Sequence, residues 1–324
     1  MQFPPLANLL FEIASFALAA VVLFKEHKED PFQRFVFVAA VVATICAELV
    51  GVRVAHGYYY SDFLIEIARP HQEGVPLCIA LDWGVIIFCL WRLGQRLDVP
   101  RIVLPFVFAL LALPLDLALD PITSLSKVAQ PMTSCIANTV PGDALGLGYW
   151  IWCVAPEDNQ RWFGVPIGNF VGWYMLVVAF TSCALIAQRR LAGRVAGATT
   201  LWLTGLGVVI GTLAIEFGSL YLFEQLEQRG ASGTGIFFVL MAIGFVAVLA
   251  SGNRRSDRRM DWWALLALIG VALCCVLAYV FALSGRVGET FVFAIVGMLV
   301  LALVLSLWVM RGWPTRAVAI SRLS

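Results

Sequence analysis

Long apolar runs recur along the chain, separated by short stretches that carry charged residues, glycine or proline. An apolar run of about 20 residues spans the hydrocarbon core of a bilayer as a helix. Strands of a membrane barrel would alternate in hydrophobicity, and these runs do not. The pattern predicts nine transmembrane helices, over residues 5–24, 33–55, 75–93, 101–120, 165–188, 199–223, 234–251, 262–283 and 289–310.

Composition agrees with this pattern. Hydrophobic residues make up 61% of the chain and charged residues 13%, and the mean hydropathy is +0.88. A soluble domain is about half apolar and a quarter charged. The first apolar run lacks a basic segment and a cleavage signal, so we interpret it as a retained helix. We therefore expect an all-α, polytopic helix bundle that forms a single integral-membrane domain over residues 1–324.

The distribution of Lys and Arg predicts the orientation. These residues gather after the first, third, fifth, seventh and ninth runs. The positive-inside rule then places the N-terminus outside and the C-terminus in the cytoplasm. The longest connection, at about 121–164, becomes an outward-facing loop. An oxidising exterior would permit Cys135 and Cys153 in this loop to pair, and two free thiols remain an equal alternative.

Five acidic residues within the apolar runs are candidates for a site: Glu48, Asp82, Asp116, Asp120 and Glu216. A charged Asp at the centre of a spanning helix costs roughly 2.5–3.5 kcal/mol on insertion scales. Such residues face the interior of a bundle and mark functional paths. With the predicted orientation, all five lie toward the outer side although they come from four different helices. Their grouping on one side favours a common site.

Two of these acids share a helix face. Asp116 and Asp120 are four residues apart, which is about one helical turn. A single acid can instead be a structural hydrogen bond to a neighbouring helix, and Asp120 can mark a helix end set by Pro121. Taken as a set, the acids favour function over structure.

Aromatic residues and one amide lie on the same predicted side. Trp and Tyr collect at membrane interfaces regardless of chemistry, so we interpret most of them as interface residues. Trp173 and Asn169 are better candidates for a site, because they are four residues apart on one helix face. Tyr58 and Trp152 flank the same region. The remaining members of the group are Tyr59, Tyr60, Trp83, Trp150 and Trp162.

Metal and nucleotide chemistry are disfavoured. The three histidines have no ligand at helical spacing within a predicted span. The chain has no phosphate-binding loop, no GxSxG and no pair of aspartate-rich motifs. A net charge of +1 does not indicate a nucleic-acid partner. We expect no metal, no cofactor and no nucleic acid.

Acids and aromatics in an apolar pocket favour one kind of chemistry. Desolvation disfavours a charged carboxylate, so such a carboxyl group can remain an acid at neutral pH. It can protonate an electron-rich alkene, and aromatic faces would stabilise the resulting cation by about 0.5–2 kcal/mol each. A second acid could deprotonate the water that traps the cation. Hydration, cyclisation and isomerisation of isoprenoids all share this first step.

At these residues the sequence resembles the integral-membrane carotenoid biosynthesis family that contains the carotenoid 1′,2′-hydratases, such as γ-carotene hydratase and bisanhydrobacterioruberin hydratase. The resemblance covers about residues 45–175. It rests on Glu48 with Gly57-Tyr58-Tyr59-Tyr60, Gly74-Val-Pro76, Asp82-Trp83, Asp116-Leu-Ala-Leu-Asp120-Pro121, Tyr149-Trp150-Ile-Trp152 and Phe163-Gly164-Val-Pro166-Ile-Gly-Asn169-Phe-Val-Gly172-Trp173. Asp82 and a longer loop after Pro121 depart from the family pattern, which puts the end group and the reaction in question.

The resemblance implies a lyase of the hydro-lyase type. It would add water to the terminal C1–C2 double bond of an acyclic carotenoid end group, in the cell membrane of a bacterium or archaeon. Its partners would be a lipid-soluble polyene substrate, membrane lipid and other carotenoid biosynthesis enzymes.

The resemblance also implies roles for individual residues. Asp116 or Glu216 would be the acid, and Asp120 or Glu48 would activate water. The substrate-binding residues would be Asn169, Trp152, Trp173, Tyr58 and Asp82.

Three alternatives remain open from the sequence, of which the weakest is a non-catalytic membrane assembly factor that would tolerate the loss of any one acid. Another isoprenoid cyclase or isomerase would use the same acids and aromatics but exclude water. A proton-coupled transporter would use membrane acids as relays. Transporters commonly show internal repeats and sites near the bilayer midplane, whereas this sequence shows no repeat and its acids lie toward one face.

Overall fold

The structure is a computed structural model, which is mostly helical. It describes residues 6–26, 31–53, 57–61, 63–68, 74–94, 99–128, 140–141, 149–154, 160–191 and 197–250, with 269, 296–300 and 303. The helices in the longer stretches are α1 Leu6–Glu26, α2 Pro31–Arg53, α3 Leu77–Gly94, α4 Leu104–Thr123, α5 Ile167–Leu191, α6 Ala198–Gln228 and α7 Gly233–Ala250. They occupy the first seven predicted spans. The eighth and ninth spans lie almost entirely outside the described residues.

Five of these helices are long and apolar enough to cross a membrane. They comprise Phe32–Arg53, Leu77–Gly94, Leu104–Thr123, Ile167–Leu191 and Thr199–Gln228. Asn8–Phe24 and Gly233–Val246 form shorter apolar helices. The predicted helical class is thereby confirmed, and the helices are compatible with a membrane protein. The count of nine spans and the orientation of the termini stay predictions.

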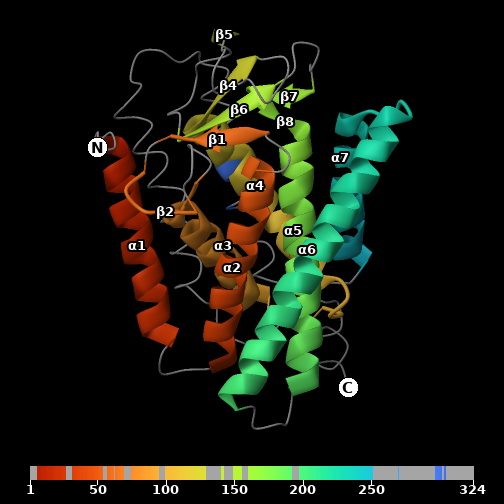
Figure 1. Ribbon diagram of the computed structural model, residues 1–324. Coiled ribbons are helices and arrows are strands. Elements are labelled where there is room, and N and C mark those ends of the chain that lie inside the picture. The colour runs from red at the N-terminus through yellow and green to blue at the C-terminus, as the bar shows by residue number, and fades with distance from the viewer. Residues whose placement is uncertain are drawn as a thin grey trace, which may run out of the picture.

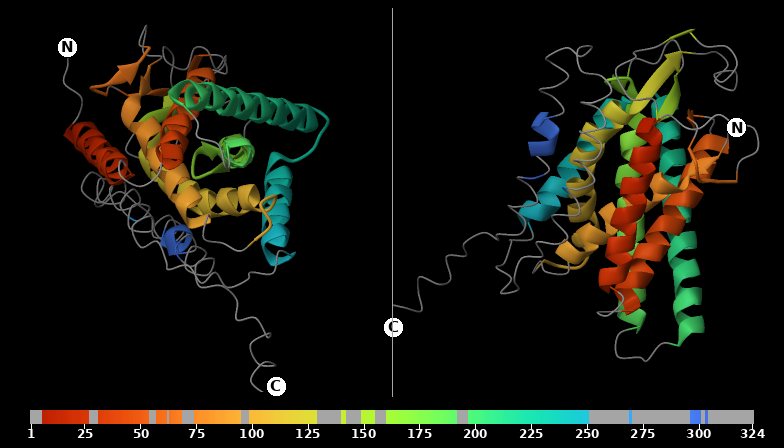
Figure 2. Two further views of the ribbon diagram at one scale, coloured as in Figure 1. Left: turned by 90° about the horizontal axis from the view of Figure 1, so that it is seen from below. Right: turned by 90° about the vertical axis from the view of Figure 1, so that its left-hand side faces the viewer.

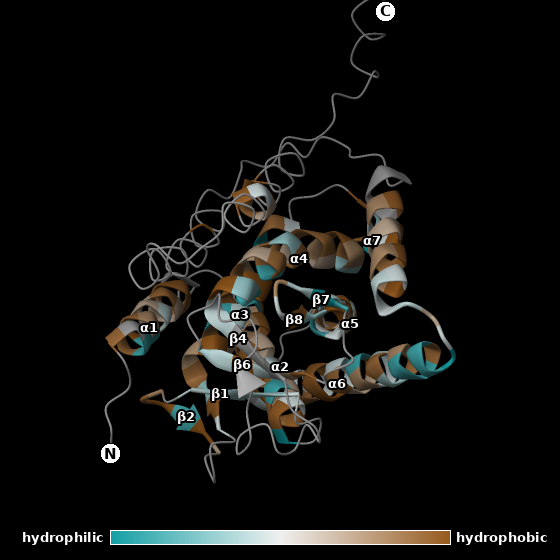
Figure 3. Cartoon of the chain, turned by 90° about the horizontal axis from the view of Figure 1, so that it is seen from above, coloured by the Kyte–Doolittle hydropathy of each residue, from teal (hydrophilic) through white to brown (hydrophobic). Residues whose placement is uncertain are grey.

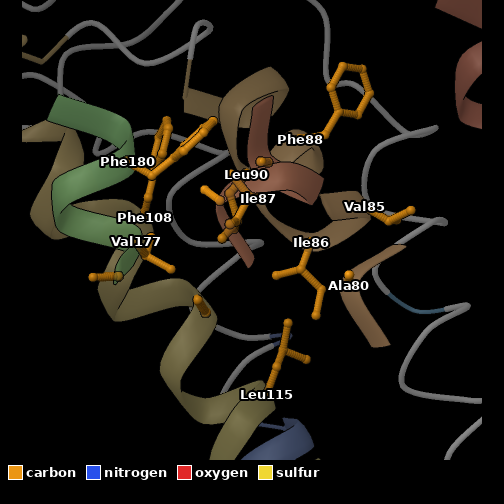
Figure 4. Packing of buried hydrophobic residues seen from close by; sticks show 14 of the residues in the cluster. Ala80, Val85, Ile86, Ile87, Phe88, Leu90, Phe108, Leu115, Val177 and Phe180 are labelled. Carbon is orange, nitrogen blue, oxygen red and sulfur yellow. The ribbon is translucent and has the colours of Figure 1, made fainter. Parts of the chain in front are cut away.

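Helix α5 lies in the middle of the bundle. Helices α2, α4, α6 and α7 all contact it and surround it when the molecule is viewed along the helices (Figures 2 and 3). The core between α3, α4 and α5 is made of large apolar side chains, including Ile87, Leu90, Phe108, Val177 and Phe180 (Figure 4). All but one of the residues of α4 are buried. This interior surrounds α4, and the C-terminal turns of α4 line a cavity.

A small sheet covers one end of the bundle, where α2 and α4 end and α3 and α5 begin (Figure 1). Its strand order is β1-β6-β4-β5, and only the β4–β6 pair is parallel. The strands are β1 Tyr58–Tyr60, β4 Ser124–Val128, β5 Val140–Pro141 and β6 Trp150–Val154. Two short pairs join β2 Glu66–Ile67 to β3 Val75–Pro76, and β7 Arg161–Trp162 to β8 Val165–Pro166.

This sheet corrects the prediction of a plain loop at about 121–164. The sequence Trp150-Ile-Trp-Cys-Val154 is rich in the aromatic and β-branched residues that favour strands, and β6 pairs with both β1 and β4. Its pairing partner β1 is about ninety residues away in sequence, so the pairing cannot be predicted from the local sequence. The described part of the segment is therefore a structured cover.

Pro121 does not end α4, which continues to Thr123. Proline has no N–H, so the carbonyl of Leu117 loses its helical hydrogen bond. The indole N–H of Trp162 donates to that carbonyl instead, at 2.9 Å. The interpretation of Asp120 as a helix end set by Pro121 is therefore wrong, and Asp120 lies within the last turn of the helix.

Helix α1 is fixed to the covered end by polar contacts. The carboxylate of Glu12 is buried and accepts hydrogen bonds from the backbone N–H groups of Leu64 and Ile65, at 2.9 and 3.0 Å. The side chain of Asn8 donates to Ser61 at 3.1 Å. Glu12 is a sixth buried acid that the sequence analysis omitted, and its partners indicate a structural role.

Candidate functional site

An acid-lined cavity lies directly beneath the sheet. It has a volume of about 60 Å³, and we call it the acid cavity. Its walls come from α1 to α5 and its cover from β1 and β6. The lining residues are Phe11, Glu48, Tyr58, Tyr60, Ile79, Asp82, Trp83, Ile86, Asp116, Leu119, Asp120, Thr123, Trp150, Trp152, Asn169 and Trp173.

Four of the five predicted acids meet in this cavity. Glu48, Asp82, Asp116 and Asp120 are each at most 9% exposed, and they come from α2, α3 and α4. The lining residues include no Lys, Arg or His. Four carboxylates without a positive partner would repel one another strongly in a medium of low polarity. The cavity is therefore suited to hold protons on its carboxyl groups.

Asp120 is held by donors on both of its oxygens. The indole N–H of Trp150 donates to Oδ1 at 2.7 Å, and the amide of Asn169 donates to Oδ2. Hydrogen bonds to an ionised acceptor are the stronger kind, so this arrangement suits a carboxylate. Asn169 thus orients a carboxyl group.

Asp116 lies one turn earlier on the same helix, and one of its carboxyl oxygens has no hydrogen-bond donor. Its Oδ2 is buried and has no hydrogen-bond partner. A buried oxygen without a donor is costly, and a proton or a bound ligand relieves that cost. Asp116 and Asp120 therefore share a face, as their spacing predicted, but have different surroundings.

One carboxylate oxygen of Glu48 accepts hydrogen bonds from two tyrosine hydroxyls. The hydroxyls of Tyr58 and Tyr60 both donate to Oε2, the second at 2.7 Å. Burial of the phenols, followed by the nearby Glu48 carboxylate, raises the pKa of Tyr58 and Tyr60 well above the ordinary value of 10. Both tyrosines therefore remain neutral donors.

Asp82 is bonded across the bundle to α1. The hydroxyl of Ser15 lies 2.8 Å from its Oδ2. Sequence reasoning did not find Ser15, because a lone serine in an apolar run carries no spacing signal. Asp82 lines the same cavity as Glu48, Asp116 and Asp120, from helix α3.

The register of β1 and β6 builds an aromatic cover. Tyr58 pairs with Trp152 and Tyr60 with Trp150. Because strand side chains alternate between faces, all four rings point to the cavity side. The ring centroids of Tyr58 and Trp152 are 4.6 Å apart. This alternation explains why neighbouring aromatics in one short sequence have different roles.

The other face of the same strands carries Tyr59, Ile151 and Cys153, which pack against one another. Cys153 is disulfide-bonded, and its partner lies outside the described residues. Cys135, the partner considered from the sequence, also lies outside them.

Two tryptophans form a stacked pair in the cavity wall. The rings of Trp83 and Trp173 have centroids 3.6 Å apart and an interplanar angle of 7°. Trp173 and Asn169 lie on one face of α5, as predicted. Trp83 was grouped with the interface aromatics, but it lines the acid cavity. Its position directly after Asp82 was the available signal.

Glu216 does not line the acid cavity. It lines a neighbouring cavity between α2, α5 and α6, which has a volume of about 410 Å³. Its side chain is 5% exposed, and its Oε2 has no hydrogen-bond partner. Glu48 lines both cavities and therefore lies between Glu216 and the other acids of the acid cavity. The prediction that Glu216 faces Asp116 and Asp120 in one pocket is therefore replaced by two adjoining cavities.

Within the described residues, no group of three or more His, Cys, Asp and Glu side chains is arranged to hold a metal ion. No protein-family model, curated protein or solved structure matches the chain. The family resemblance therefore stays a prediction, and the arguments below rest on the geometry of the site.

Proposed function

We propose that this protein is a cofactor-independent hydratase of carotenoid biosynthesis, which adds water to the terminal double bond of an acyclic polyene. The observation that carries the proposal is a cavity with four acids, no basic lining residue and an aromatic cover, set within apolar helices. This combination supplies a proton, stabilises a cation and holds a polar acceptor. It fits acid-catalysed addition to an alkene.

In this proposal nine helices span the cell membrane of a bacterium or archaeon. The covered end faces the exterior and the C-terminus lies in the cytoplasm. The alternation of Lys and Arg along the chain supports this orientation. A lipid-soluble substrate would reach the site from the bilayer, and other enzymes of the pathway would be its neighbours.

Asp116 is the proposed acid. Its oxygen without a donor can carry a proton and deliver it to C2 of the terminal double bond. The cation then forms at C1, which bears more substituents. The stacked rings of Trp83 and Trp173 and the ring of Trp152 lie in the cavity wall and can face this cation.

Asp120 is the proposed base. Water attacks the cation at C1, and its departing proton passes to the Asp120 carboxylate, which Trp150 and Asn169 hold in place. The product is a tertiary alcohol. One water has been added, and Asp116 and Asp120 have exchanged one proton. Their positions one turn apart on α4 allow the proton to return before the next turnover.

An isomerase or cyclase is the second candidate, because Asp120 can also take a proton from carbon. The same first step would then end by loss of a proton instead of addition of water. The two functions differ in product mass, since only hydration adds a water.

The test is expression of the protein in cells that accumulate lycopene or γ-carotene, followed by mass analysis of the extracted carotenoids. Hydration predicts a product heavier by one water for each end that reacts. A new product of unchanged mass would instead support the isomerase or cyclase. Unchanged carotenoids across several acyclic end groups would contradict the proposal.

A further inference from the structure

The cavity that contains Glu216, which we call the vestibule, lies against the acid cavity. It is bounded by α2, α5 and α6 at the covered end of the bundle. The two cavities share five lining residues: Glu48, Tyr58, Trp152, Asn169 and Trp173. A single layer of side chains therefore separates the vestibule from the acids.

One face of α6 forms the outer wall of the vestibule. Glu216, Leu220 and Glu224 all line it, and their spacing of four places them in a row. Eight residues of helix rise by about 12 Å, so the row runs about that far along the wall. Glu224 is exposed, whereas Glu216 is buried. The row thus leads from the surface to a buried carboxyl group.

The outer end of this row lies where α6 becomes hydrophilic. From Glu224 onward the helix reads Glu-Gln-Leu-Glu-Gln, after an apolar stretch of more than twenty residues. Figure 3 shows this change in hydropathy at the end of α6. A spanning helix that turns polar has reached the level of water and head groups. The mouth of the vestibule therefore lies at the depth of the lipid head groups, where water is present.

Glycines on α5 keep the opposite wall open. A Cβ on Gly172 would lie 3.6 Å from Leu220, and a Cβ on Gly168 would lie 3.6 Å from Phe223. A methyl group would only touch the facing helix, but a longer side chain would fill the space between them. The sequence thus leaves room where α5 faces α6.

The unpartnered Oε2 of Glu216 points to what occupies the vestibule. A buried carboxyl oxygen without a donor is costly. Water is the usual partner where a cavity is polar and large enough to hold it. We propose that the vestibule admits water from the exterior to the acid cavity, with Glu216 as its inner polar anchor. The proposed function enters only in naming this water as the co-substrate, because the route itself does not require any reaction.

The test is chemical labelling of the full-length protein in membrane fragments open on both sides, without substrate. The variants Leu220→Cys and Leu222→Cys place a thiol on α6 at nearly the same depth. Leu220 faces the vestibule, whereas Leu222 is 58% exposed on the outer surface of the bundle and would face lipid. A water-soluble thiosulfonate reagent is added to each variant and to the parent chain, and the additional labelling is followed over time.

We expect Leu220→Cys to react at least about tenfold faster than Leu222→Cys, because the reactive thiolate forms where water reaches the sulfur. Adding Glu216→Leu should slow the reaction of Leu220→Cys, and adding Glu216→Gln should not. Gly172→Cys on the facing helix should also react quickly. It replaces Leu220→Cys as the vestibule probe if that variant does not fold.

Equal rates at positions 220 and 222, or no effect of Glu216→Leu, would overturn the water route. This outcome is separate from the fate of the proposed function. Fast labelling together with unchanged carotenoids would remove the hydratase but keep the vestibule. Hydrated products together with slow labelling would keep the hydratase but remove the vestibule as the water route.

Discussion

Asp116 and Asp120 are the same residue type on the same helix face, yet their surroundings differ. Asp120 accepts hydrogen bonds from Trp150 and Asn169, whereas Asp116 has a buried oxygen with no donor. Hydrogen-bond donors stabilise a carboxylate, and their absence leaves an oxygen free to carry a proton. At the residue scale, two carboxyl groups in one cavity can therefore act as acid and base.

The proposed role of Asp116 as the acid is tested by Asp116→Asn. The amide keeps the shape of the carboxyl group but cannot deliver an acidic proton, so conversion should fall by about 10²–10⁴-fold, the usual contribution of general acid catalysis. Amounts of protein in the membrane should not change. Glu66→Gln is the control, because it removes a carboxyl group outside the cavity. Full activity of Asp116→Asn would remove Asp116 from the mechanism.

The base is tested by a matched pair of tryptophan variants. Trp150→Phe removes the N–H that reaches Asp120, and Trp162→Phe removes the N–H that reaches the carbonyl of Leu117. The first should lower turnover by about tenfold or more, because a hydrogen bond to a charged group is worth about 1.5–3 kcal/mol. The second should lower thermal stability and keep turnover. The opposite assignment of effects would contradict the role of Asp120.

At the element scale, a short strand pair decides which aromatics reach the site. The register of β1 and β6 turns Tyr58, Tyr60 and Trp152 toward the acids and turns Tyr59 away from them. This follows from the two-residue period of a strand. Substitutions at positions 58 and 60 should therefore affect turnover, whereas a substitution at position 59 should not.

The alternation predicts the outcome of three tyrosine variants. Tyr58→Phe and Tyr60→Phe each remove a donor to Glu48, so each should lower turnover and the double variant should lower it further. Tyr59→Phe should keep turnover, because Tyr59 packs with Ile151 and Cys153 on the other face. Turnover and retention of protein in the membrane are measured for each variant. Equal losses at all three positions would indicate a general effect on the fold.

Local spacing found the parts of the site that lie on single helices. The four-residue spacings of Asp116 with Asp120 and of Asn169 with Trp173 were enough to predict shared faces. The contacts of Ser15 with Asp82 and of Tyr60 with Glu48 could not be found in this way. They join segments whose approach depends on how α1 packs and how β1 pairs, and no periodicity encodes either.

At the scale of the whole molecule, consecutive helices alternate in direction. The start of α1, α3, α5 and α7 and the end of α2, α4 and α6 all lie at the covered end, as Figure 1 shows. Apolar length predicted each helix, but not the sheet that covers them, because its strands are short and pair across long sequence distances. The acids gather at that end because the sheet and the helix termini meet there.

The predicted orientation gives a direct topological test. A peptide tag inserted at the exposed turn around Gly230 should be digested by protease added outside intact cells, because this turn lies at the covered end. A tag inserted at Gly197, before α6, should be protected. The physical reason is the retention of Lys and Arg in the cytoplasm during insertion. Protection at position 230 together with digestion at position 197 would reverse the orientation.

In the proposed reaction, the acid cavity protonates an alkene carbon and water traps the cation. It is tested most directly with purified protein in lipid, given an acyclic carotenoid in heavy-oxygen water and separately in deuterium oxide. We expect one heavy oxygen in the new hydroxyl group at C1 and one deuterium at C2, and we expect both labels to be lost in Asp116→Asn. A product that carries deuterium without the heavy oxygen, or neither label, would contradict the proposed reaction.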